Sequence, residues 1–342
     1  MDKKNLMKNI VSKTILFIAI ILFVLVFKTF FGDENVPIAI ATVITLLMLL
    51  SKNLTKKPVR NFSILLGINL AIGIGALIAA SNVWLGIIID FTALSLIGYY
   101  FSYEMTKGLI LPYGLQYLFL LNGPVYGEEF IKRILALIAG AVIIMISQFI
   151  VNSKKNDSFK EENHILSIKG RKSDKVYKTI NIFGRDVKVH TIRASYAIRV
   201  GILTALTSFI AQYFKLAEGR WMAYTIFSLT ELYSENTKIK ALKRIQGTII
   251  GSIILLVIFF FVKSPALRGV VILIAGYLNS FAVDYRDMMI LVTISAVAPL
   301  ALVEGAGPAV FERIFYVVIG IILALLANKF ILRKSKEDYI EE

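Results

Sequence analysis

The chain has no cysteine and only two histidines among its 342 residues. The lack of cysteine excludes disulfides and thiolate metal sites, and both histidines, His164 and His190, lie in one polar segment. The sequence also contains no metal-ligand spacing, phosphate-binding Walker loop or nucleophile elbow. It therefore predicts neither an enzyme nor an ATP-driven pump, and it predicts no cofactor and no metal site.

Charged residues are scarce as well. They make up 18% of the chain, against about 25% in a soluble domain, whereas 57% of the residues are hydrophobic. Apolar runs recur along the whole length, which is typical of an all-α polytopic membrane protein. No small-residue cleavage site follows the first run, so we expect it to stay as a transmembrane helix. The pattern predicts about twelve spans, of which the second, fifth and eighth are short: 14–31, 36–51, 61–80, 83–101, 108–122, 131–151, 195–215, 220–234, 243–263, 266–283, 288–304 and 310–332.

Basic residues outnumber acidic ones by 38 to 23, which gives a formal charge of +15. In a membrane protein such an excess marks the cytoplasmic side and the anionic leaflet, so no nucleic-acid partner is predicted. An inside N-terminus places most lysines and arginines in cytoplasmic segments, and the reverse orientation places most of them outside. We therefore expect a multi-pass protein of the plasma membrane with both termini in the cytoplasm.

One sizeable polar segment, 152–194, divides the chain. The predicted organisation is a first six-helix unit at 1–151, this basic cytoplasmic linker, a second six-helix unit at 195–332 and a cytoplasmic tail at 333–342. Within the linker, VYKTINIFGRDVKVH alternates apolar and polar residues around Phe183-Gly184-Arg185-Asp186. A small β-hairpin and a solvated linker explain this pattern equally well.

The two six-helix units share a spacing in which a glycine follows an arginine by seven residues. Six spans per unit give both copies one orientation, so the units are predicted to be parallel repeats, with a transport site where they meet. At a similar offset Glu104 corresponds to Asp284. The repeated pairs are Arg60 with Gly67 and Arg244 with Gly251, at the cytoplasmic start of the third span of each unit, and Arg133 with Gly140 and Arg313 with Gly320, at the outer start of the sixth.

Seven residues make nearly two helical turns, so each arginine shares a helix face with its glycine. Glycine lets a second helix approach closely, and Gly247 with Gly251 forms a GxxxG pair that favours such a contact. Arg60 and Arg244 are then either topology anchors or contacts for a substrate anion. Arg133 and Arg313 lie on the predicted outer side and need another reason. The alternatives are pairing with Glu128, Glu129 or Glu312, or binding an anion.

The second unit resembles the membrane domain of the fusaric acid resistance (FUSC-like) and aromatic acid exporter superfamily. The resemblance is carried by Arg199, by Trp221 and by the motif Arg244-Ile-Gln-Gly247-Thr248-Ile-Ile-Gly251. It implies bacterial inner-membrane efflux of aromatic or other organic acids driven by the proton gradient. Plant malate-type anion channels are similar to this superfamily. Many such exporters carry large cytoplasmic domains, whereas here only the short 152–194 segment stands between the units.

Several further residues are candidates for function because ionisable groups within a membrane are costly. Asp90 is the most deeply placed, and it is predicted either to carry a proton or to partner a polar helix contact. Glu231 and Asp284 are further candidates for proton coupling, and their structural alternatives are a cytoplasmic cap and an ion-pair turn. Trp221 and Tyr224 fit either an interface anchor or an aromatic clamp for substrate.

The sequence thus favours a transporter that exports organic carboxylic acids, including aromatic ones, in exchange with protons. Arg244, and with it Arg60, would attract the substrate carboxylate. The two rival hypotheses are a passive anion channel acting as a dimer and a non-transporting scaffold of the cell envelope. The expected partners are membrane lipid, a small organic anion and, for the channel, a second copy of the chain.

Overall fold

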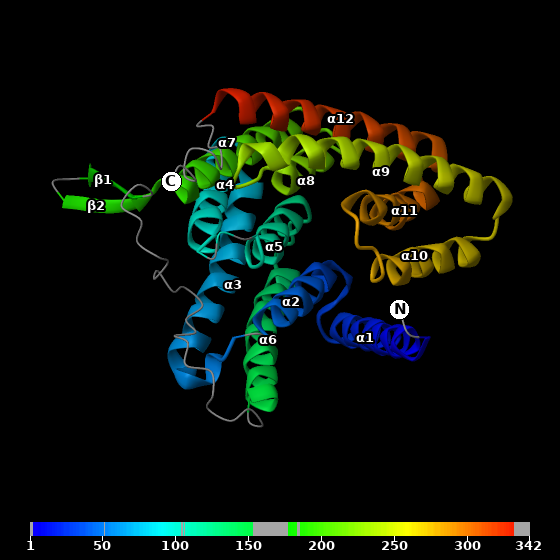
Figure 1. Cartoon of the computed structure of the whole chain (residues 1–342), viewed down its shortest axis with the longest axis horizontal. Helices are drawn as coiled ribbons and strands as arrows, with labels where there is room; N and C mark the ends of the chain where they lie inside the picture. The colour runs from blue at the N-terminus through cyan, green and yellow to red at the C-terminus, as the bar shows by residue number, and fades with distance from the viewer. Residues whose placement is uncertain are drawn as a thin grey trace.

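A computed structural model describes residues 3–50, 52–103, 105, 107–152, 177–182 and 185–331 (Figure 1). Every predicted apolar run forms a helix within these residues. The short 3-10 helices η1, Asp33–Asn35, and η2, Leu54–Lys56, precede α2 and α3. The α helices are α1 Lys3–Phe31, α2 Val36–Leu49, α3 Pro58–Ser81, α4 Val83–Tyr100, α5 Ile110–Asn122, α6 Glu128–Asn152, α7 Thr191–Tyr213, α8 Arg220–Leu229, α9 Ser234–Phe261, α10 Pro265–Asn279, α11 Tyr285–Val303 and α12 Ala306–Phe330.

Eight of the described helices are long and apolar enough to cross a membrane: α1, α3, α4, α6, α7, α9, α11 and α12. The remaining four, α2, α5, α8 and α10, have 14, 13, 10 and 15 residues. At 1.5 Å per residue they rise about 15–23 Å, which is less than the roughly 30 Å of a hydrocarbon core. The prediction of an all-α polytopic protein is therefore confirmed, whereas twelve complete spans are not.

Helix ends follow ordinary local signals. Pro58 and Pro265 open α3 and α10, where their missing amide hydrogens cost no helical bond. The Asn82 side chain caps α4 by accepting from two backbone amides. The predicted start of the third span in the second unit is wrong: α9 begins at Ser234 and not at 243, because the polar stretch SENTKIKALK continues the helix beyond the apolar run. Arg244 therefore lies inside α9 rather than at its start.

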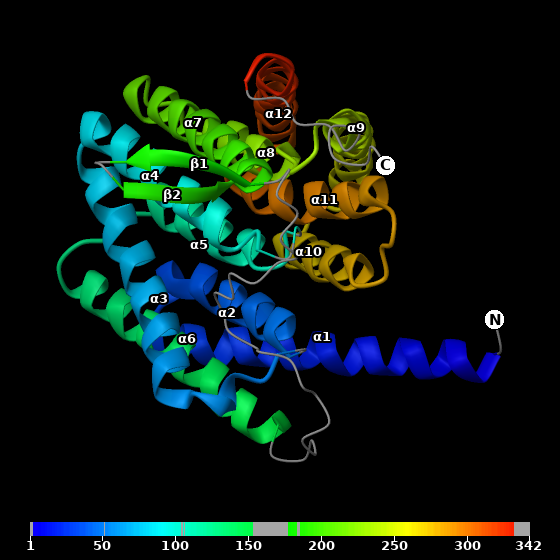
Figure 2. The same ribbon diagram turned by 60° about the vertical axis from the view of Figure 1, so that its left-hand side comes forward.

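The two halves of the chain meet where α4 packs along α7 and α5 touches α8 (Figures 1 and 2). Glycines set the distance between α4 and α7. A β-carbon at Gly98 would lie 3.2 Å from the Ala197 Cα, and one at Gly201 would lie 2.0 Å from the Ser95 Oγ. Small residues thus bring the two backbones together, as is common between helices in membranes.

Four helix contacts in the first half have counterparts between helices of the same order in the second half. The contacts of α1 with α2, α2 with α6, α3 with α5 and α3 with α6 correspond to those of α7 with α8, α8 with α12, α9 with α11 and α9 with α12. In each half, a glycine of the sixth helix also faces a threonine of the second helix. A β-carbon at Gly140 would lie 2.7 Å from the Thr42 Oγ1, and one at Gly320 would lie 2.8 Å from the Thr225 Cβ.

The apolar cores of the halves are arranged differently. Buried residues of α2 to α6, together with parts of α7 and α8, form one continuous cluster. The second half has two separate clusters. The cluster that includes Leu255 and Val310 packs α9, α10, α11 and α12 together. The other includes Ala241 and Val317 and joins α7, α8, α9 and α12. On both α9 and α12, the residues between these clusters include polar ones.

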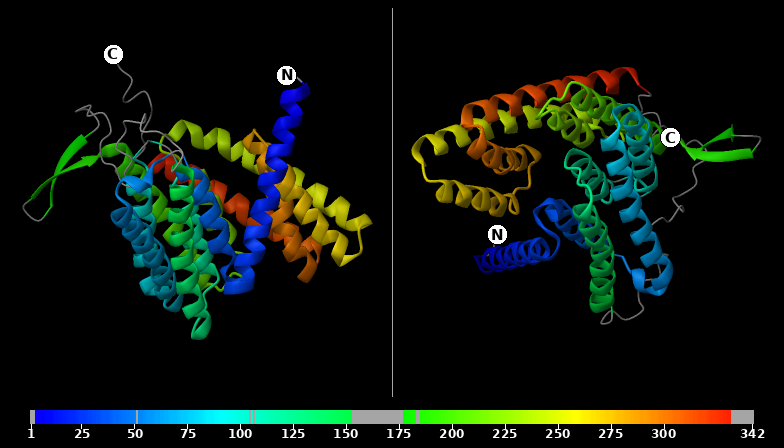
Figure 3. Two further views of the ribbon diagram at one scale, coloured as in Figure 1. Left: turned by 90° about the horizontal axis from the view of Figure 1, so that it is seen from below. Right: turned by 180° about the vertical axis from the view of Figure 1, so that it is seen from behind.

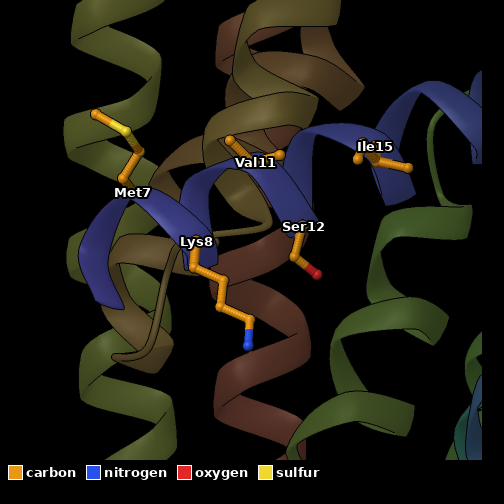
Figure 4. A pocket seen from close by; sticks show the side chains of 5 residues that line it. All are labelled: Met7, Lys8, Val11, Ser12 and Ile15. Atoms are coloured by element: carbon orange, nitrogen blue, oxygen red, sulfur yellow. The ribbon is translucent and has the colours of Figure 1, made fainter. Parts of the chain in front are cut away.

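The exterior includes a β-hairpin and an exposed helix. Strands β1, Tyr177–Ile182, and β2, Arg185–His190, pair antiparallel and project from the helices (Figure 3). Residues 183–184, most of the predicted linker, Glu104 and the predicted tail lie outside the described residues, whereas Arg185 and Asp186 belong to β2. Helix α1 exposes much of its apolar surface, including a hollow of about 440 Å³ lined by Met7, Lys8, Val11, Ser12 and Ile15 (Figure 4). Such a surface suits contact with lipid.

Candidate functional site

The residues between the two apolar clusters of the second half form a buried polar layer. This layer is well inside the bundle, since most of its side chains are nearly inaccessible to solvent. Its members come from four different helices that pack on one another. We define the polar layer as Trp221 of α8, Arg244, Thr248 and Ser252 of α9, Thr293 of α11 and Arg313 of α12.

Helix α9 presents its part of the layer through helical spacing. Arg244, Thr248 and Ser252 are four residues apart, so they share one face of the helix. Gly247 and Gly251 lie on the adjoining face and contact α11. A β-carbon at Gly247 would lie 2.7 Å from the Arg286 carbonyl oxygen, and one at Gly251 would lie 2.6 Å from the Ile290 carbonyl oxygen. The expected close-packing role of these two glycines is confirmed, and it fixes α9 against α11.

This contact makes a direct prediction for Gly251. We expect Gly251→Val to lower stability by about 1–3 kcal/mol, because the new side chain would force α9 away from α11. Thermal unfolding in detergent measures the loss. Gly67→Val is the matched control, since no neighbouring atom lies within 4 Å of a β-carbon there. Equal losses in the two variants would contradict the packing argument. Gly67 thus keeps the predicted spacing without the predicted close contact.

Arg244 is buried, with 4% of its surface exposed. Its Nη1 donates to the Ser228 Oγ at 2.7 Å and to the Tyr285 hydroxyl at 3.1 Å. Its Nε has no hydrogen-bond partner among the described residues. The Arg244 guanidinium is therefore held by neutral groups, and its positive charge is not neutralised by a described carboxylate.

Arg313 is more deeply buried, with 2% of its surface exposed. Its guanidinium carbon lies 3.9 Å from the centre of the Trp221 ring, a cation–π contact. Within the described part of the chain, its Nε and Nη1 have no hydrogen-bond partner, and neither does the Trp221 Nε1. Arg313 makes no described ion pair with Glu312, one of the predicted partners, although it interacts electrostatically with Glu218 and Arg244.

The two arginines lie at opposite ends of the ten-residue helix α8. Arg313 covers Trp221 at the N-terminal end, and Arg244 binds Ser228 at the C-terminal end. The helix dipole makes the C-terminal end favourable for a cation and the N-terminal end unfavourable. Arg313 thus carries two unfavourable features together, a positive helix end and unpaired nitrogen atoms. A bound anion would relieve both.

The corresponding arginines of the first half have different surroundings. Arg133 is 3% exposed, and its three nitrogens are all bonded: Nε to the Asn35 Oδ1 at 3.0 Å, Nη1 to the Gly123 carbonyl at 2.7 Å and Nη2 to the Glu34 carbonyl at 2.9 Å. It therefore ties α6 to the start of α2. Arg60 is exposed on the surface of α3. The buried guanidinium nitrogens without a hydrogen-bond partner among the described residues belong to the second half.

Three predicted proton-coupling residues lie outside the polar layer. Asp90 of α4 is 1% exposed and accepts a hydrogen bond from the Tyr117 hydroxyl at 2.5 Å. Asp284 caps α11 by accepting from the Arg286 amide at 2.8 Å. A hydrogen bond from Lys243 lowers the pKa of Asp284 below its ordinary value. Glu231 follows α8 and forms ion pairs with Lys107 and Lys240.

Several important contacts were missed by reasoning from the sequence. Ser228 and Tyr285 hold Arg244, and Glu218, which is 4% exposed, lies near Arg313 and pairs with Arg220 at 2.6 Å. The nearness of Glu218 and Trp221 along the chain was the available signal, because both flank the start of α8. Trp221 is held inside the bundle under Arg313. Tyr224 is also buried, and its ring lies 5.3 Å from that of Phe119.

Arg199 has a structural role in the same half. It is 1% exposed, and its guanidinium donates to the Asn328 Oδ1 at 2.7 Å and to the carbonyl oxygens of Glu231 and Leu232. It therefore joins α7, α12 and the segment after α8. Because its donors are occupied, Arg199 differs from Arg244 and Arg313, which retain free donors.

Comparison with known proteins singles out the half that contains the polar layer. No curated protein and no solved structure matches the chain. Residues 193–327, less than half of the chain, match the family model described as fusaric acid resistance protein-like. They include nearly all of α7 to α12 and every residue of the polar layer. The second half of the chain is therefore similar to the fusaric acid resistance protein-like family, and four of the eight described helices that are able to cross a membrane, α7, α9, α11 and α12, lie in it.

Proposed function

We propose that this protein exports organic carboxylic acids, including aromatic ones, across the plasma membrane. The substrate carboxylate binds in the polar layer between Arg313 and Arg244. The observation that carries the proposal is the pair of buried arginines with donors that no described residue accepts. The fusaric acid resistance-like match over the same helices supports transport as the purpose of the site.

The chemistry of the layer favours a carboxylate as the ligand. Guanidinium groups present donors whose geometry matches a carboxylate, and hydrogen bonds between charged groups are stronger than neutral ones. Burying a charge without a partner is costly, so an anion gains binding energy by neutralising Arg313. The Trp221 ring beside Arg313 offers a flat apolar surface on which the ring of an aromatic acid can lie.

The orientation and the internal repeat are parts of the same proposal. Both termini lie in the cytoplasm, and the two halves are parallel six-helix repeats. The recurrence of the α2–α6 contact in α8–α12, with a threonine facing a glycine in each, supports the repeat. The binding site, however, lies within the second repeat rather than where the two repeats meet.

Uptake into everted vesicles tests the proposal. Vesicles containing the protein are expected to accumulate labelled hydroxybenzoate, and those lacking it are not. Imposing a pH gradient should increase the accumulation if protons drive export. Absence of uptake for a panel of organic acids would overturn the transport proposal. Uptake that does not depend on the pH gradient, and that depends only on the membrane potential, would instead indicate the passive channel.

Asp90 is the proposed proton carrier because it is a buried carboxylate whose described bond comes from a neutral hydroxyl. We expect Asp90→Asn to retain hydroxybenzoate movement down its gradient and to lose the stimulation by a pH gradient. The vesicle assay with and without the gradient measures this difference. Asp284→Asn is the matched control, since Asp284 is partly exposed and caps a helix. Stimulation that survives in Asp90→Asn would assign coupling to another group.

A further inference from the structure

A cluster of charged side chains lies at the C-terminal end of α8, whereas Arg313 lies at its N-terminal end. The Glu231 carboxylate lies 3.2 Å from the Lys107 Nζ and also contacts the Lys240 Nζ. The side chains of Lys107 and Glu231 are each 10% exposed, and that of Lys240 is 35% exposed. Two ammonium groups therefore share a single carboxylate in a largely buried place. We call these three residues the inner cluster.

The inner cluster adjoins the proposed site through two shared residues. Ser228 accepts from Lys107 at its carbonyl oxygen, 3.1 Å away, and from Arg244 at its hydroxyl oxygen. Tyr285 holds Arg244 through its hydroxyl, and its ring centre lies 5.5 Å from the Lys240 Nζ. An anion at the inner cluster would thus be separated from the Arg244 guanidinium by the shared residues Ser228 and Tyr285.

The charge around the cluster is positive overall. Lys107 and Lys240 supply two positive charges against the one negative charge of Glu231. Arg199, which also interacts with Lys107, adds a third positive charge. The other facing groups are the neutral Tyr196, whose ring centre lies 5.7 Å from the Lys107 Nζ, and Tyr285. The place can therefore accept a further negative charge or exchange one carboxylate for another.

We propose that Lys107 and Lys240 form an inner subsite for the carboxylate of the transported acid, and that the Glu231 side chain fills this subsite when no acid is bound. An incoming carboxylate displaces that of Glu231 and then passes to Arg244. This inference rests on the proposed function. Nothing covalent changes: one pair of oxygen acceptors replaces another on the same ammonium groups.

The subsite also joins the two halves of the protein. Lys107 lies in the segment between α4 and α5, whereas Glu231 and Lys240 belong to the second half. Exchange of the carboxylate would loosen the link that Glu231 makes between them. Burial lowers the pKa of Lys107 from its ordinary value to about 8, and the charge of Glu231 opposes this shift. Lys107 is therefore mainly protonated below about pH 8, when the subsite attracts anions most strongly.

Chemical rescue tests the subsite without measuring transport. Glu231→Gln leaves the buried Lys107 ammonium group and the partly exposed Lys240 ammonium group without a counter-charge, so we expect the melting temperature in detergent to fall by about 5 °C or more. Acetate at about 50 mM, compared with chloride at equal ionic strength, should restore at least half of this loss. In a triple variant that combines Glu231→Gln, Lys107→Gln and Lys240→Gln, acetate should not raise the melting temperature more than chloride does. Rescue by chloride as large as that by acetate, or no rescue, would overturn the inner subsite.

Lys240→Gln provides a second measurement if Glu231→Gln does not fold. Lys240 is partly exposed, so its replacement should leave folding intact. We expect the half-saturation concentration for hydroxybenzoate on the cytoplasmic face to rise at least about 5-fold, with a nearly unchanged maximal rate. An unchanged half-saturation concentration would contradict the subsite. Because wild-type uptake is measured in parallel, failure of the subsite is distinguishable from failure of the transport proposal.

Discussion

Replacement of Arg313 by glutamine should reduce hydroxybenzoate uptake into everted vesicles by at least about 100-fold while leaving the protein folded. The reduction follows from the loss of charge-assisted hydrogen bonds to the substrate, each of which contributes about 1.5–3 kcal/mol. Stability should change little, because the Arg313 Nε and Nη1 have no described hydrogen-bond partner to lose, and removal of a buried charge offsets the loss of the cation–π contact with Trp221. Uptake is measured per folded molecule, and folding is checked by the melting temperature.

Arg313→Lys separates charge from geometry in the same assay. Lysine keeps the positive charge but lacks the planar fork of guanidinium donors, so we expect a partial loss that lies between wild type and Arg313→Gln. If Arg313→Gln transports normally, the polar layer is not the binding site. If it instead fails to fold, Arg313 is a structural residue like Arg133.

Arg133→Gln should have the opposite effect: a large loss of stability with little change in uptake per folded molecule. Arg133 donates to Asn35, Gly123 and Glu34, and its removal leaves the buried Asn35 oxygen and two partly buried carbonyl oxygens without their partner. Hydrogen bonds between helices in membranes average about 0.6 kcal/mol, and those to charged groups are stronger, so we expect a loss of about 2–4 kcal/mol. Denaturation in mixed micelles measures this loss.

The two variants can be compared directly, because Arg133 and Arg313 each lie on the last helix of their half of the chain. Both precede a glycine by seven residues on the sixth helix of their half. A stable Arg133→Gln protein with impaired uptake would mean that the first half also contributes to the binding site. A loss of stability in both variants would remove the distinction that we draw between the halves.

The locations of the helices could be predicted from the sequence because each apolar run is distinct and bounded by polar or proline residues. The lengths were less predictable. Helix α9 extends through a polar stretch that does not need a membrane, so hydropathy alone could not find its start at Ser234. Helix α8 ends at Leu229, whereas the predicted span continues to 234. The segment that follows Leu229 contains Glu231.

The candidate site was only partly predictable. The Arg-to-Gly spacing singled out Arg244 and Arg313, and the glycines of α9 pack as expected. The same spacing could not tell Arg313 from Arg133, because the difference lies in what each meets on another helix. Asn35 and two carbonyl oxygens accept from Arg133, whereas an indole ring lies against Arg313. Only the packing of α12 on α8 reveals that second contact.

The division of the apolar interior of the second half into two clusters has a mechanical consequence. Each cluster holds its own ends of α9 and α12 together through contacts that must stay packed. The layer between them, by contrast, offers donors that a passing anion or water can satisfy in turn. Both ends of α9 and α12 are therefore stiff, and the polar contacts between these ends can change without opening either apolar cluster.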